Sequence, residues 1–144
     1  MKNIIYVIAL AIVTVACQPK ENALSIKDET MKLHDLVMAN HSKIIANQMK
    51  IDTLLGSLSK VKAQIPLLDT LAEKAALIKL RSDLVVAEDS MNNWMHQFNA
   101  DFNSQLDWEV IHYYKQERDK IAKISELYKK EIKQSDTYLT KFKN

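Results

Sequence analysis

The chain has 144 residues and a formal net charge of +2, with 20 Lys and Arg against 18 Asp and Glu. Because the lysines alternate with acidic residues, there is no basic stripe of the kind that binds nucleic acid, and we expect no such partner. One Gly and two Pro leave few sites for chain reversal, which favours a few long helices. The single cysteine excludes an intramolecular disulfide.

The first seventeen residues predict export followed by lipidation. An apolar run over residues 4–16 follows Lys2. As a helix this run would rise about 20 Å, short of the ~30 Å hydrocarbon core, so its length is typical of a signal peptide. The run ends in Thr14-Val15-Ala16-Cys17, which resembles a lipobox with Thr14 in place of the usual Leu. We therefore expect residues 1–16 to be a signal peptide and Cys17 to be lipidated; the alternative is an ordinary secretory signal with a chance cysteine.

Residues 17–25 read as a lipidated tether. Each buried methylene of an acyl chain adds roughly 0.8 kcal/mol to membrane binding, so two or three chains form a permanent anchor. Gln18, rather than Asp, follows the cysteine, which by analogy with lipoprotein sorting rules favours the outer membrane. Lys20-Glu21 weakly resembles a signal for export to the cell surface. We expect a lipid-anchored protein of the cell envelope, facing either the periplasm or the surface.

The rest of the chain, residues 26–144, has apolar residues at helical spacing. We expect helices over about residues 26–62, 67–99 and 105–142. Pro66 ends the first helix. The second begins either with Asp69 as its N-cap or with Pro66 in its first turn. Ser104 with Asp107 resembles a capping box for the third. The apolar stripe of the second helix comprises Leu71, Ala75, Leu77, Ile78, Leu84, Val85, Met91, Trp94, Met95 and Phe98.

These elements predict an all-α fold, an elongated antiparallel three-helix bundle with coiled-coil-like packing. The alternative is an extended coiled-coil dimer, because three slender helices bury a thin core. If the chain turns near residues 63–67, residues of the first and second helices lie at the same height when their numbers sum to about 130. If it turns again near residue 102, residues of the second and third helices lie at the same height when their numbers sum to about 204. This register brings all four histidines, His112 among them, to the end of the bundle nearest the lipid.

Methionines gather at the same end, and imidazole with thioether is a donor set that suits copper, above all the cuprous ion. The candidate metal ligands are His34, Met38, His41, Met91, Met95 and His96. Haem iron held by one His and one Met is a further possibility. Methionine is also an ordinary filler of helical cores, so the leading expectation is no cofactor, with copper as the alternative.

Motifs of high specificity are absent from the sequence: there is no His-Glu-x-x-His, no Cys-x-x-Cys and no Gly-rich phosphate loop. We therefore predict that the protein is not an enzyme. Aromatic residues surround the expected second loop, where they either close the end of the bundle or dock a partner. The candidate partner-binding residues are Trp94, Phe98 and Trp108.

The segment His34-Asp35-Leu36-Val37-Met38 is similar to the His-Asp-x-Val-Met segment of small Bacteroidetes lipoproteins labelled "viral A-type inclusion protein". Residues 87–98 resemble the Met-x-x-Trp-Met-x-x-Phe segment of that family, and residues 114–121 resemble the charged start of its last helix. The resemblance implies a helical lipoprotein and carries no assigned activity.

The sequence thus predicts a lipid-anchored, non-enzymatic helical bundle that acts as an interaction or structural module of the envelope. Its expected partners are the membrane, through the anchor, and either an envelope protein or a second copy of the chain. The alternative function is periplasmic copper binding or delivery by the His/Met cluster. In either case we expect binding at the membrane-proximal end.

Overall fold

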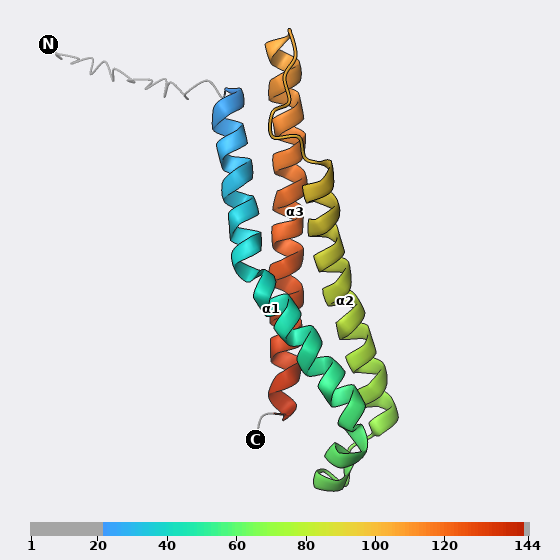
Figure 1. The fold of residues 1–144 in the computed structure, drawn as a ribbon. Helices are drawn as coiled ribbons and strands as arrows, with labels where there is room; N and C mark the ends of the chain where they lie inside the picture. The colour runs from blue at the N-terminus through green and yellow to red at the C-terminus, as the bar shows by residue number, and fades with distance from the viewer. Residues whose placement is uncertain (1–21, 143–144) are drawn as a thin grey trace, which may run out of the picture.

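The computed structural model describes residues 22–142, so the predicted signal peptide, Cys17 and most of the tether lie outside the described residues. Within residues 22–142, every secondary-structure element is helical: α1 (Ala23–Gln64), α2 (Thr70–Gln97), α3 (Asp107–Leu139) and a short 3-10 helix η1 (Thr140–Phe142). The three long helices lie side by side in a slender rod (Figure 1). The prediction of an all-α three-helix bundle is confirmed, and each long helix begins and ends within three residues of its expected bounds.

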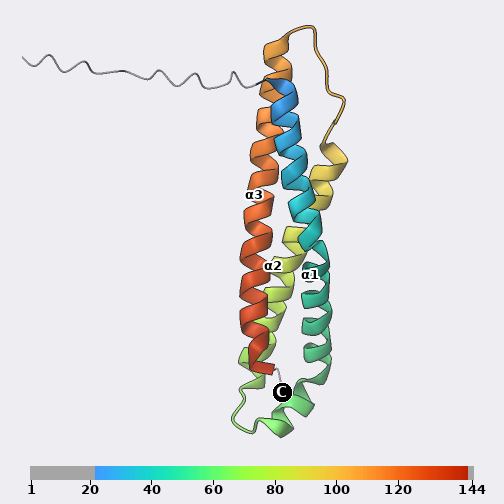
Figure 2. The ribbon, with the colours of Figure 1, turned by 90° about the vertical axis from the view of Figure 1, so that its left-hand side faces the viewer.

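Helix α2 runs antiparallel to both neighbours, so α1 and α3 are parallel to each other (Figures 1 and 2). Contacts between side chains fix the alignment of α1 with α3: the His41 imidazole meets the Tyr128 hydroxyl, 87 positions further along the chain. Between α1 and α2, Asp52 accepts a hydrogen bond from Arg81, and their numbers sum to 133. This value agrees with the expected register of about 130.

The register between α2 and α3 differs from the prediction. Tyr138 donates to the Glu73 carboxylate, so level positions sum to 211 rather than about 204. The reason is the loop over residues 98–106, which climbs alongside α3 instead of reversing at once (Figure 2). The Tyr113 hydroxyl accepts from the Asn99 amide at 2.7 Å and holds the start of this loop.

This shift of seven positions corresponds to about 10 Å along a helix. It lifts His112 toward the beginning of α1, away from the height of Met91. The expected height of His112, level with Met91, is therefore wrong, whereas its expected place at the end of the bundle where α1 begins is not contradicted. The loop is the cause of this error. Because its nine residues run alongside α3, each residue of α3 lies level with a different residue of α2 than expected.

The helix ends show which capping residues the sequence identifies correctly. The Asp69 carboxylate accepts from the amides of Leu71 and Ala72 at 3.0 and 3.1 Å, which confirms it as the N-cap of α2. The capping box at Ser104 is wrong, because Leu106 precedes the first helical residue of α3 and supplies no side-chain cap. Ser104 instead accepts from the Leu106 amide within the loop.

The core runs along the whole axis and is mainly aliphatic. Its fully buried members include Ile44, Ile51, Leu77, Leu84, Met91 and Ile121. Among residues 22–142, no helix has the length and apolar character that crossing a membrane requires.

Candidate functional site

The two histidines of α1 each contact a ring of a neighbouring helix, and each has a polar partner, on α1 for His34 and on α3 for His41. The His34 ring lies 6.0 Å from the Trp94 ring, and its Nδ1 is 2.9 Å from a carboxylate oxygen of Asp35. The His41 Nδ1 is 3.2 Å from the Tyr128 hydroxyl, and the two rings stack with centroids 6.4 Å apart. One nitrogen of each imidazole is therefore engaged by a protein group.

The other candidate metal ligands lie in different surroundings. Met91 is fully buried in the core, Met38 and Met95 are each 38% exposed, and His96 is exposed on α2. Among residues 22–142, no group of three or more His, Cys, Asp or Glu side chains is arranged to hold a metal ion. A thioether and imidazole set is a different kind of site, so copper binding stays a prediction.

The aromatic residues near the second loop form a continuous stack. Trp94 packs on Phe98 with ring centroids 4.6 Å apart, and Phe102 packs on Tyr113 at 4.2 Å. Trp94 is only 5% exposed, and Phe98 is half-buried. These rings close the upper part of the bundle, where the loop replaces α2 as the third layer. Of the three candidate partner-binding residues, Trp108 alone presents a large accessible surface, at 63%.

A buried polar contact joins α1 to α3. The Asn47 side-chain amide donates to Ser135 Oγ at 2.9 Å and to an Asp136 carboxylate oxygen at 2.8 Å. Ser135 in turn donates to the Glu131 carbonyl at 2.7 Å. Buried amides cost free energy unless their donors are satisfied, so this contact favours one alignment of the two parallel helices.

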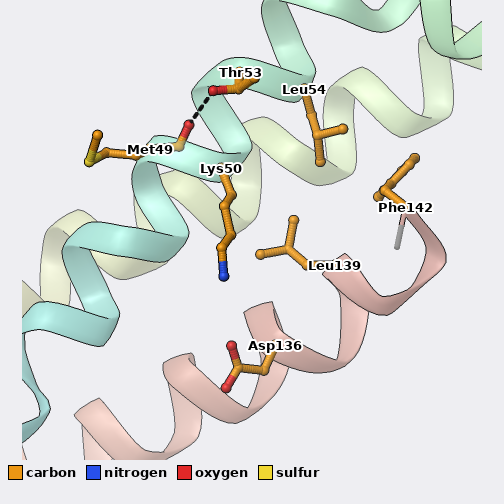
Figure 3. A pocket seen from close by; sticks show the side chains of 7 residues that line it. All are labelled: Met49, Lys50, Thr53, Leu54, Asp136, Leu139 and Phe142. Carbon is orange, nitrogen blue, oxygen red and sulfur yellow. Dashed lines mark hydrogen bonds between the residues drawn. The ribbon is translucent and has the colours of Figure 1, made fainter. Parts of the chain in front are cut away.

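A groove with a volume of about 370 Å³ lies between α1 and the C-terminal end of α3. Figure 3 shows Lys50 reaching into it from α1, opposite Asp136 on α3, with Leu54, Leu139 and Phe142 on its apolar side. The groove offers one cation and one anion beside an apolar wall. Because Asp136 already accepts a hydrogen bond from Asn47, its carboxylate belongs to the contact that aligns the two helices.

The outward side of α2 carries a row of uncharged side chains, three or four residues apart. We call this set the α2 row; its members are Leu71, Ala75, Ile78, Ser82 and Val86. Spacings of three and four place residues on one helix face. Leu71 is 78% exposed, Ile78 50% and Val86 54%. Neither α1 nor α3 covers this face, because both pack against the other side of α2.

Leu71, Ala75 and Ile78, which we expected in the buried stripe of the second helix, are exposed in the structure. The second helix contains two apolar rows with a spacing of seven, one beginning at Leu71 and the other at Leu77. Leu77, Leu84 and Met91 are fully buried, whereas Leu71 and Ile78 are exposed and Val85, the next member of their row, is half-buried. Periodicity identifies both rows, but a three-helix bundle covers only one of them.

Fold and surface thus define an all-α bundle with one exposed apolar face on α2. No protein-family model matches the chain, and no curated protein or solved structure matches it either. The resemblance to small lipoproteins therefore stays a prediction.

Proposed function

We propose that the protein is a lipid-anchored, non-enzymatic interaction module of the cell envelope, whose α2 row docks an amphipathic helix of a polypeptide chain. The observation that supports this proposal is the exposure of Leu71, Ile78 and Val86 in a row whose five members are uncharged and which Asp89 ends. Burying one such aliphatic side chain contributes roughly 1.5–3 kcal/mol. Contiguous apolar surface of this kind on a soluble domain marks an interaction site.

The anchor and the docking face would lie at opposite ends of the rod. Asn22, the first described residue, follows Cys17 by five positions, whereas Ile78 lies level with about residue 55 of α1. The difference of 33 residues corresponds to about 50 Å of helix. The α2 row would therefore stand clear of the headgroups, where a partner can approach it from the side.

A capture experiment tests the proposal. The chain from Gln18, which contains every residue of the bundle, is immobilised and exposed to solubilised envelope. We expect the wild type to retain a specific protein, which is either an envelope protein or the chain itself. Ile78→Glu should lower retention at least tenfold, since a carboxylate would be buried in the contact.

Leu24→Glu is the matched control, because Leu24 is 68% exposed but lies at the other end of the bundle. This variant should retain as much partner as the wild type. Equal retention by Ile78→Glu, or no retained partner together with turnover of a substrate by the purified protein, contradicts the proposal.

A further inference from the structure

We propose that the helix docking on the α2 row is α2 of a second copy of this chain, packed antiparallel in a symmetric dimer. This inference rests on the proposed function, since it names the partner of the same surface. It is argued from the side chains of the row, from the charges beside it, and from the position of Arg81.

The α2 row alternates large and small side chains, as a helix-to-helix seam requires. Ala75 separates Leu71 from Ile78, and Ser82 separates Ile78 from Val86. In an antiparallel pair centred near residue 81, Ile78 of one copy packs beside Ser82 of the other. The small side chain leaves room for the large one, so the same face serves both copies.

The charges beside the row change sign at its middle. Lys74 and Lys79 precede Ser82, whereas Asp83 and Asp89 follow it. In the antiparallel pair, Lys79 lies level with Asp83 of the other copy, and Lys74 lies close to the height of Asp89 of the other copy. A parallel copy would instead place each lysine beside its own equivalent, and like charges brought together are unfavourable.

Within one chain, Lys79 already contacts Asp83 at 2.7 Å, and the lysine side chain is 75% exposed. The Asp83 side chain is 28% exposed. A pair with an exposed lysine contributes little, so its ions are available to a cluster of two lysines and two aspartates. Arg81 lies at the centre of the pair but is turned toward Asp52 of α1, to which it donates a hydrogen bond. Its charge is thus neutralised within the chain.

Exchange of charges tests the register. The chain from Gln18 is studied by sedimentation equilibrium as wild type, as Lys79→Glu and as Asp83→Lys. We expect the wild type to dimerise and each variant to dissociate roughly tenfold more readily or worse, because each brings like charges together twice. An equimolar mixture of the two variants should recover wild-type affinity, because opposite charges again face each other. Helical content measured by circular dichroism confirms that each variant is folded.

A cysteine pair tests the seam directly. The chain from Gln18 has no cysteine, so Ser82→Cys introduces the only thiol. A disulfide requires Cα atoms within about 7 Å, so mild oxidation should give a covalent dimer of Ser82→Cys. Ser42→Cys, on the exposed side of α1, should give none. Equal cross-linking of the two variants would overturn the proposal.

A monomeric wild type at about 100 μM, or a variant mixture that stays dissociated, would also overturn it. The two proposals fail separately. If the wild type is monomeric while Ile78→Glu still loses an envelope protein, the partner is a different chain and the proposed function stands. If Ile78→Glu loses no partner in either experiment, both proposals are wrong.

Discussion

The side-chain amide of Asn47 in α1 donates a hydrogen bond to the hydroxyl of Ser135 in α3, with 2.9 Å between nitrogen and oxygen. Both residues are buried. Parallel helices with aliphatic faces can slide by a turn at small cost, whereas a buried amide finds its acceptors in one alignment only. The contact therefore explains why α1 and α3 adopt this register over their shared length.

Removal of the Asn47 amide should destabilise the bundle. Asn47→Ala loses two hydrogen bonds and leaves a small void, so we expect the free energy of unfolding to fall by about 2 kcal/mol. Asn47→Leu fills the space, and Ser135 keeps its hydrogen bond to the Glu131 carbonyl, so its loss should be smaller. Urea denaturation measures both variants. A larger loss for Asn47→Leu than for Asn47→Ala would contradict this role.

The buried phenol of Tyr128 should make the free energy of unfolding fall at alkaline pH. Burial, and after it the nearby Glu88 carboxylate, raises the pKa of Tyr128 to about 12, above the ordinary value of 10.0. The folded state therefore favours the neutral phenol, and its contribution is complete below pH 10 and lost as pH rises to about 12. Tyr128→Phe cannot ionise. The free energy of unfolding of the wild type should thus fall more steeply over this interval than that of Tyr128→Phe, and parallel curves would refute the assignment.

Lipidation of Cys17 is tested in cells by metabolic labelling with a palmitate analogue. We expect label on the wild-type protein and none on Cys17→Ser, because the chain has no other cysteine. The variant should also leave the membrane fraction, since its anchor is absent. An unlabelled wild type would contradict the lipid anchor of the proposed function but not the docking face.

Titration with the cuprous ion decides the alternative function. One nitrogen of His34 and one of His41 already have partners, and Met91 is enclosed in the core. We therefore expect an affinity for the cuprous ion no better than about millimolar. The double variant with His34→Ala and Met38→Ala should show the same affinity as the wild type. Tight binding that the double variant abolishes would instead support copper delivery.

The sequence was sufficient to predict the helices themselves. Helical spacing of apolar residues, Pro66 and the capping carboxylate of Asp69 all act locally, so their consequences can be inferred without knowing the packing. The register of α3 could not be predicted in this way. It depends on how Phe102 and Tyr113 stack, with centroids 4.2 Å apart, and neither loop length nor composition specifies that contact.

The candidate site was harder to predict than the fold for a similar reason. Ile78 and Leu77 are equally apolar, and only the position of the other two helices leaves one exposed and the other buried. The sequence placed binding at the membrane-proximal end, where histidines and methionines gather, whereas the α2 row lies on the opposite half of the rod (Figure 1). The apolar residues of α2 outside the row Leu77, Leu84 and Met91 were the available indication.

Photo-cross-linking at position 78 in intact cells tests the central claim, that the α2 row is a covered docking face, most directly. A benzophenone amino acid replaces Ile78 in one strain and the exposed Lys123 of α3 in another. We expect a light-dependent product of defined mass at position 78 and none at position 123. No product at position 78, or the same product at both positions, would contradict the claim.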